Sequence, residues 1–571
     1  MRALKILILI PILLACQTLT PTPTGTPPPD TATPPGAVTD PDPPPTSTIP
    51  PSPTPTATLS LPTASPLEGI SPTDFSVRLH PDGGLYTGDL VSFEVIAPPD
   101  VNLDDRQISI RINGETELDP AGFGSFGIGG RYQATLWWAW DTTGLPPGDY
   151  TLTYAIIPDG PSWTETLTLL PDTALPYPEP QAAWATAESN CCLFYYITGT
   201  AAARDIETLM QIADQQAENI TQQFGGVELE EPITVVFVPR VLGQGGFAGS
   251  EIYISYLDRN YAGNAPGQVL SHEIVHILDG RLGGEFRPTL FVEGLAVYLS
   301  GGHFKKEPLM PRAAEALDLG WYLDLQPLAD DFYPSQHEIS YLEAASLIQY
   351  MVETWGWQAF SDFYRNIQPD PDHRQSAAID QALQARFGLT FEQLETQFLD
   401  ALAQLPDNPT LEDDVRLTVM FFDTVRRYQQ AMDSSAYFLT AWLPDGPTMW
   451  ERGIVADFVR HPAAPENIAL ETLLVNADAD LRSGNYVQAE YALQAANAVL
   501  EAYEAGDTSP FYAHPLAADH LAVVLAVQAA GYTPQKIRID GQQARVWANA
   551  GEEELVALMM QREETGWVLE E

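Results

Sequence analysis

The chain has 571 residues, and its 76 acidic against 27 basic side chains give a formal net charge of −49. This balance excludes nucleic acid and anionic lipid head groups as partners, because phosphate recognition needs clustered lysine and arginine. The part after the first 70 residues is long enough for three domains, and three cysteines are too few for a disulfide scaffold.

Residues 1–16 read MRALKILILIPILLAC, a short basic region followed by an apolar run that is too short to span a bilayer. The ending Leu13-Leu14-Ala15-Cys16 resembles a bacterial lipobox, in which the cysteine is lipidated and becomes the mature N-terminus. The resemblance implies a lipoprotein signal peptide and a lipid on Cys16 that anchors the protein to the bacterial cell membrane or cell surface. The alternative is an ordinary secretory signal with an incidental cysteine, and either segment directs the protein out of the cytoplasm.

Residues 17–70 form a Pro- and Thr-rich stretch that includes TPTPTGTPPPDTATPPG. The stretch has too little apolar content for a core, so it cannot offset the entropy that is lost on ordering. Proline keeps such a chain extended and semi-rigid. We therefore expect a disordered linker that spaces the folded part from the membrane.

Residues 71–172 contain six strand-like runs with alternating, β-branched or aromatic residues: FSVRL, LVSFEVIA, QISIRIN, RYQATLWWAW, DYTLTYAII and SWTETLTLL. Turn sequences such as PDGG and LPPGD separate the runs. This number of short strands indicates an immunoglobulin-like β-sandwich. We interpret it as a spacer or orienting module, and a substrate- or glycan-binding domain is the alternative.

The central region, residues 173–405, contains the adjacent pair Cys191 and Cys192. Neighbouring cysteines bond to each other only with strain, so we expect either buried thiols or an unusual vicinal bridge. Helical periodicity covers residues 201–224, and the nearly unbroken apolar run at 233–238 indicates a buried strand.

Residues 271–302 contain His272-Glu273-Ile274-Val275-His276, an H-E-x-x-H sequence. Two histidines four residues apart lie on one face of a helix, where both rings can reach a single Zn²⁺. Glu273 does not bind the metal in this arrangement and is placed to accept a proton from a zinc-activated water. By itself the motif also fits a solvated helix with incidental histidines.

A catalytic zinc usually has three protein ligands, so a third ligand is needed here. Glu293 is the candidate, because a second helix is predicted at residues 289–299, after a break made by glycines and Pro288. Gly294 and Ala296 are small, and we expect them to let this helix pack closely against the first.

The sequence HEIVH, followed by the glutamate of an E-G-x-A segment, resembles the gluzincin branch of zinc metallopeptidases. The resemblance implies a zincin-like α+β domain in which His272, His276 and Glu293 hold Zn²⁺ and Glu273 is the general base. Gluzincin-like folds also place a sheet edge beside the zinc, where an extended peptide adds as another strand. The small residues of 246–254 make this stretch the expected edge, with a mobile hairpin as the alternative.

Peptidases with a similar second half often show a tyrosine opening a later helix that ends in W-G or Y-G, and here the helix ends at Trp355-Gly356. A phenol near the zinc can donate a hydrogen bond to the oxyanion that forms during hydrolysis. Tyr341 is therefore the expected donor and His337 the second candidate. The alternative is that Tyr341 only packs.

Three further polar residues of the central region are assigned from their sequence context. Asp279 is a candidate for orienting a ligand imidazole. His303 and His373 lie in loop-like sequence, and we expect them at the surface.

Residues 406–505 are predicted to be helical, and one fragment resembles a helical-hairpin repeat without a second copy. Residues 506–571 change to strand patterns: KIRID, ARVWANA, LVALMMQRE and GWVLEE. Helices followed by such a sheet resemble a small nuclear-transport-factor-like (NTF2-like) α+β domain.

The sequence thus predicts a multidomain, extracellular zinc metallopeptidase that binds a peptide or protein substrate. One alternative is a non-catalytic surface binding protein with a peptidase-like fold. The other is a zinc hydrolase that acts on a non-peptide amide, such as a cell-wall amide.

Overall fold

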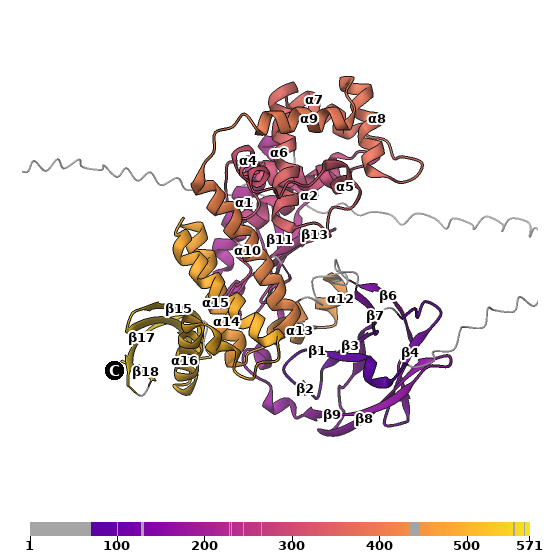
Figure 1. Cartoon of the computed structure of the whole chain (residues 1–571). Coiled ribbons are helices and arrows are strands. Elements are labelled where there is room, and N and C mark those ends of the chain that lie inside the picture. The colour runs from indigo at the N-terminus through magenta and orange to yellow at the C-terminus, as the bar shows by residue number, and fades with distance from the viewer. Residues whose placement is uncertain are drawn as a thin grey trace, which may run out of the picture. The chain divides into compact units, whose positions relative to one another are not determined.

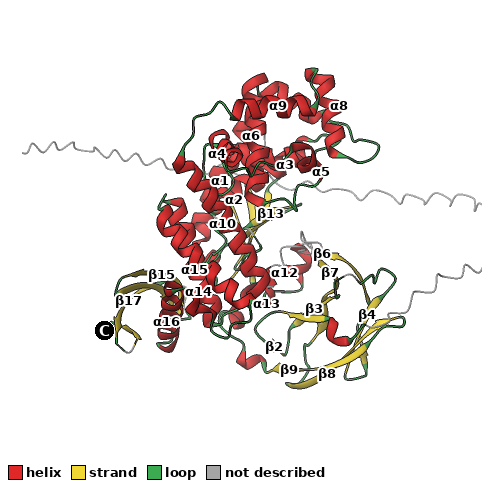
Figure 2. Cartoon of the chain, viewed as in Figure 1, coloured by secondary structure: helices red, strands yellow, loops and turns green. Residues whose placement is uncertain are grey.

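The structure is a computed structural model, and it describes residues 70–571 except for positions 100, 127–130, 228, 230, 244, 264, 434, 437–445, 552, 553, 565 and 571. The described chain has a sheet-rich N-terminal region, a largely helical central region and a small C-terminal sheet (Figures 1 and 2). The predicted signal peptide, the lipid site at Cys16 and the Pro- and Thr-rich linker lie outside the described residues, apart from residue 70. No helix in the described part is long and apolar enough to cross a membrane.

The N-terminal region is a nine-stranded sheet with the strand order β1-β3-β7-β6-β4-β8-β9-β2, in which β5 also pairs with β4. Alternating burial explains the strands: in β8, Tyr150, Leu152, Tyr154 and Ile156 point into the core, and the residues between them are exposed or half-buried. The strands are β1 (Ser76–His80), β2 (Leu85–Tyr86), β3 (Leu90–Ile96), β4 (Gln107–Ile112), β5 (Thr116–Glu117), β6 (Ala121–Phe126), β7 (Arg131–Asp141), β8 (Gly148–Ile157) and β9 (Ser162–Leu170).

The central region is built on a five-stranded sheet with the order β10-β11-β12-β14-β13. The inner strands β11, β12 and β14 are parallel and apolar, as expected for strands that are covered on both faces, and the edge strands β10 and β13 are antiparallel. The strands are β10 (Trp184–Glu188), β11 (Cys192–Ile197), β12 (Ile233–Val238), β13 (Gly246–Ala248) and β14 (Ile252–Ser255).

Helix α1 lies between β11 and β12 in the chain and the other helices follow β14, and their apolar residues share one core with the sheet. Helix α1 matches the predicted helical periodicity, and α6 ends at Gly356, as the W-G sequence predicts. The helices are α1 (Ala201–Gln223), α2 (Pro266–Leu282), α3 (Thr289–Ser300), α4 (Leu309–Asp318), α5 (Leu325–Asp330), α6 (His337–Trp355), α7 (Trp357–Arg365), α8 (Gln375–Phe387) and α9 (Phe391–Leu402).

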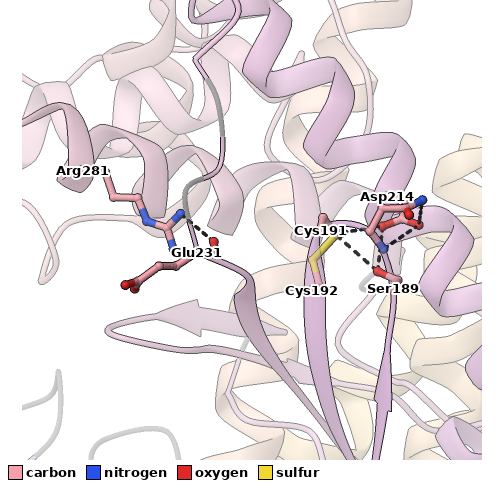
Figure 3. Close-up of a disulfide and its surroundings, with 7 residues drawn as sticks. Ser189, Cys191, Cys192, Asp214, Glu231 and Arg281 are labelled. Atoms are coloured by element: carbon pink, nitrogen blue, oxygen red, sulfur yellow. Dashed lines mark hydrogen bonds between the residues drawn. A yellow bond between two sulfur atoms is a disulfide. The ribbon is translucent and has the colours of Figure 1, made fainter. Parts of the chain in front are cut away.

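Cys191 and Cys192 form a vicinal disulfide at the start of β11 (Figure 3). Both residues are buried. The Cys191 backbone N–H and the Ser189 hydroxyl donate to Asp214 Oδ1 on α1, at 2.9 and 2.7 Å. Of the two alternatives left open by the sequence, the structure therefore has the bridge, and hydrogen bonds join this end of β11 to α1.

Helix α3 lies between α2 and α6 and packs against both. The expectation that Gly294 lets α3 approach α2 is wrong, because a Cβ at Gly294 would lie 2.6 Å from the carbonyl oxygen of Ala344 on α6. Consecutive helix residues point about 100° apart. Since Glu293 faces α2, Gly294 faces the other neighbour and permits close contact with α6.

The C-terminal part is helical and ends in an antiparallel sheet with the order β15-β16-β17-β18, in agreement with the four strand patterns of the sequence. The elements are α10 (Pro409–Met432), α12 (Gly446–Glu451), α13 (Ala456–Val459), α14 (Pro465–Arg482), α15 (Tyr486–Glu504), α16 (Pro515–Ala529), β15 (Thr533–Asp540), β16 (Gln543–Asn549), β17 (Val556–Glu563) and β18 (Gly566–Leu569). Val415 and Val419 on α10 belong to the same core as α2, α3 and α6.

The contact at Gly294 predicts that Gly294→Ala destabilises the protein by about 1–3 kcal/mol, since a rigid backbone carbonyl blocks the new methyl group. Thermal unfolding of the full chain measures the effect as a lower Tm. The matched control is Gly122→Ala on the exposed face of β6, where a Cβ meets nothing within 4 Å. Equal Tm values for the two variants would contradict the predicted close approach of α3 and α6.

Candidate metal centre

Helix α2 carries both histidines of the H-E-x-x-H sequence on one face. The helix begins with Pro266 at its first turn and ends at Gly283, whose φ of 79° is strained for other residues. Leu270, Ile274 and Leu278 recur every four residues and are buried in the core. His272 and His276 have the same spacing on a neighbouring face, so their rings lie one turn apart.

The structure brings His272, His276 and Glu293 together, as the sequence predicts. The Nε2 atoms of the two histidines are 3.0 Å apart. Glu293 Oε2 on α3 lies 3.4 Å from His272 Nε2 and 3.3 Å from His276 Nε2. In the described part of the chain, these residues form the one group of three or more His, Cys, Asp or Glu side chains whose ligand atoms could hold a metal ion.

The geometry of the three atoms fits a zinc ion. Zinc bonds to imidazole nitrogen and carboxylate oxygen are about 2.0–2.2 Å long, and tetrahedral angles then place neighbouring ligand atoms about 3.3–3.5 Å apart. The observed separations of 3.0 to 3.4 Å are close to this requirement. Two imidazoles and one carboxylate, with a fourth position left for water, are also a ligand set of catalytic zinc sites.

The charges of the group also favour a cation between the three side chains. Burial raises the pKa of Glu293, but the two histidines more than reverse this and hold it well below its usual value. Burial lowers the pKa of both imidazoles, and it brings His272 to about 4. The Glu293 carboxylate outweighs burial at His276 and raises its pKa to about 9. One proton therefore stays beside the carboxylate, at a place where a metal ion would displace it.

Glu273 is buried beside these ligands on α2. Its Oε2 is inaccessible to solvent and has no hydrogen-bond partner among the described residues. Burial raises the pKa of this carboxyl group to about 7. A Cβ at Gly246 on β13 would lie 3.7 Å from Glu273 Oε1, so the edge strand of the central sheet passes next to this side chain. The predicted general base and the predicted sheet edge are thus neighbours.

Tyr333 is a member of the site that the sequence did not indicate. Its hydroxyl donates a hydrogen bond of 2.7 Å to Glu293 Oε1. The other oxygen of this carboxylate, Oε2, is the one that faces the two histidines. Tyr333 lies between α5 and α6 in a segment without a motif, and its distance from Glu293 in sequence gives no spacing signal. Burial and Glu293 raise the pKa of the phenol, which therefore stays protonated and can donate.

Tyr341 lies beside the histidine pair, with its ring centre 6.1 Å from that of His272. The expectation that His303 is a surface residue is wrong, because it is largely buried and stacks on Tyr341 at 4.4 Å. His303 Nδ1 donates to Glu338 Oε2 at 3.0 Å, which fixes the imidazole. His337 packs against the same two rings, at 4.7 Å from each. The two glycines that end α3 lie immediately before His303 and turn the chain back toward the site. They are the sequence feature from which the position of His303 could have been predicted.

Asp279 does not orient a ligand imidazole by a hydrogen bond, contrary to the expectation. Its carboxylate accepts from Arg287 at 2.9 Å and from Tyr364 at 2.8 Å, and it pairs with Arg365 at 2.6 Å. These contacts tie the end of α2 to α7, so Asp279 has a structural role. His373 is exposed, as expected.

Comparisons with known proteins add little to this geometry. No protein family model matches the chain. No curated protein matches it either. Among solved structures, native yeast LTA4 hydrolase is similar with a TM-score of 0.31 and 10% sequence identity, over 76% of this chain and 92% of that chain. A TM-score of 0.31 does not establish a shared fold, so the function is inferred from the site itself.

The metal centre predicts that the purified protein binds about one zinc ion per chain and that His272→Ala binds none. Elemental analysis after dialysis against zinc measures the stoichiometry. His373→Ala is the matched control, because it removes an exposed histidine and should leave the zinc content unchanged. Full zinc retention in His272→Ala would contradict the assignment of this ligand.

Proposed function

We propose that this protein is a zinc-dependent metallopeptidase of the gluzincin type that acts outside the cytoplasm. The observation that carries the proposal is the convergence of His272 Nε2, His276 Nε2 and Glu293 Oε2 within 3.0 to 3.4 Å, next to the buried and unpartnered Glu273 Oε2. A structural zinc site is usually closed by four protein ligands, whereas three ligands beside an acid–base group favour catalysis.

A zinc ion held at this site would supply Lewis-acid chemistry that polarises a carbonyl and activates a water molecule. His272, His276 and Glu293 hold the metal. Glu273 accepts the proton of the water at a carboxylate oxygen and later delivers it to the leaving nitrogen. The buried position of Glu273 keeps competing solvent away from this oxygen.

Strand β13 is the proposed docking edge for the substrate. In the described chain it pairs with β14 on one side and ends the sheet, and its Gly246 adjoins Glu273. An extended peptide can add to such an edge through main-chain hydrogen bonds. The absence of a side chain at Gly246 lets β13 pack closely against Tyr253 of β14 and Val269 of α2, which holds the free edge of the sheet beside the proposed base. The substrate class is therefore a peptide or an extended protein segment.

Tyr341 is the proposed donor to the oxyanion that forms from the scissile carbonyl. Its ring lies beside His272 and is held by stacking against His303 and by contact with Phe332, whose ring centre is 5.2 Å away. A rigidly held phenol next to the ligands is suited to stabilise developing negative charge.

The remaining assignments follow from the sequence patterns. In this proposal the N-terminal sheet forms an immunoglobulin-like sandwich, whose two halves are joined in the described chain only by the short β4–β6 pairing. The central region is zincin-like, and the final helices and sheet form an NTF2-like domain. A lipid on Cys16 anchors the protein outside the cytoplasm, and the Pro- and Thr-rich linker spaces the enzyme from the membrane.

We expect Glu273→Gln to retain zinc and to lower kcat by about 10²–10⁴-fold, because the amide cannot accept the proton. The assay is cleavage of an unfolded protein by the full chain, with the products identified by mass spectrometry. A chelator should abolish wild-type cleavage, and added zinc should restore it.

If the zinc-loaded wild type cleaves no member of a mixed peptide library, the peptidase proposal is wrong. Activity on a cell-wall amide alone would replace it by a non-peptide zinc hydrolase.

Tyr341→Phe should lower kcat by about 10²–10³-fold with little change in KM or zinc content, since it removes only the oxyanion donor. Steady-state kinetics on a cleaved peptide separate the two constants. Tyr350 lies further along the same helix, and Tyr350→Phe is the control for any effect of losing a tyrosine hydroxyl from α6. A wild-type kcat in Tyr341→Phe would leave this tyrosine with a packing role.

A further inference from the structure

The two oxygens of Glu293 have different partners. Oε2 faces both imidazole nitrogens, at 3.3 and 3.4 Å. Oε1 accepts a hydrogen bond of 2.7 Å from the hydroxyl of Tyr333. The carboxylate is therefore engaged on one side by the proposed metal ligands and on the other by a neutral donor.

Tyr333 reaches Glu293 from a short segment between α5 and α6. The preceding residue, Phe332, is 3% exposed and contacts the ring of Tyr341, which anchors the segment to the core. Tyr333 itself is 47% exposed, so its ring contributes little to the core and only its hydroxyl enters the site. The contact with Glu293 is thus specific to one polar atom, which a single substitution can remove.

We propose that Tyr333 is a positioning residue for the metal centre, which holds Glu293 so that the carboxylate binds the metal through Oε2 alone. The inference rests on the metal-binding part of the proposed function. A carboxylate that is 6% exposed is free to rotate unless both oxygens have partners, and an unpartnered buried oxygen is costly. The phenol satisfies Oε1 and fixes the plane of the carboxylate.

The same hydrogen bond sets the electronic character of the ligand. A phenol that donates to Oε1 withdraws negative charge from the carboxylate and excludes this oxygen from the metal. Outer partners of metal ligands typically change metal affinity by about 10–100-fold when they are removed. Among the described hydrogen bonds, the one from Tyr333 makes this residue the outer partner of Glu293.

The test is the zinc affinity of Tyr333→Phe in the full chain, measured by competition with a chromophoric chelator. We expect binding about 10–100-fold weaker than in the wild type. The absorption spectrum of the Co²⁺-loaded variant should also change in its d–d bands, because a second carboxylate oxygen can then approach the metal. Because the substitution leaves the buried Glu293 Oε1 without its hydrogen bond, we also expect a modest fall in the metal-free Tm, and the Co²⁺ spectrum separates the positioning role from this loss of stability.

Tyr322→Phe is a matched control, since it also removes a phenol-to-glutamate hydrogen bond, that of 2.9 Å to Glu395. It should leave the zinc affinity and the Co²⁺ spectrum unchanged. Wild-type zinc affinity and an unaltered Co²⁺ spectrum in Tyr333→Phe would overturn the positioning role while leaving the metallopeptidase proposal intact. Absence of zinc binding by the wild type would overturn both.

Discussion

The site depends on one electrostatic constraint, which is the burial of the Glu293 carboxylate between two imidazole nitrogens. Removing a carboxylate from water is costly unless a positive charge and hydrogen bonds replace the lost hydration. His276 supplies that charge as a proton in the metal-free protein, where its pKa is about 9. A divalent cation supplies more charge at the same place and bonds to all three side chains. Metal binding must therefore release a proton from this pair, so that affinity depends on pH.

The packing of α2, α3 and α6 places the Glu293 carboxylate between the two histidines. Helix α3 must present Glu293 to α2 while it packs closely on α6, and Gly294 makes the second contact possible because it has no side chain. The approach of α6 then brings Tyr341 beside His272, and the segment before α6 brings Tyr333 to Glu293. One small residue next to the third ligand thus determines which aromatic side chains can line the centre.

The local part of the site could be predicted from the sequence, and the tertiary part could not. The spacing of His272 and His276 fixes their common face as soon as the helix forms, and Glu293 follows from the need for a third ligand. The direction of Gly294, by contrast, depends on which neighbour α3 meets. Tyr333 and His303 reach the site through loops whose path is set by packing, so no periodicity marks them. The elements with regular burial, such as β8 and α2, were predictable because burial follows their periods, whereas short or irregular elements such as β5, β10 and α5 carry no such pattern and were not predicted.

The support of the site extends beyond the segment that contains its motifs. Glu338, which holds His303, also pairs with Arg312, a fully buried side chain on α4. Arg312 in turn pairs with Asp414 at 3.0 Å, and Asp414 lies on α10, after the predicted end of the peptidase region at residue 405. A chain ending at residue 405 would lose this carboxylate together with Val415 and Val419, and would leave Arg312 with one buried partner fewer. Because Val415 and Val419 are buried in the core that α2, α3 and α6 share, their loss would expose apolar surface of that core, and α10 is therefore a structural part of the region that carries the metal ligands.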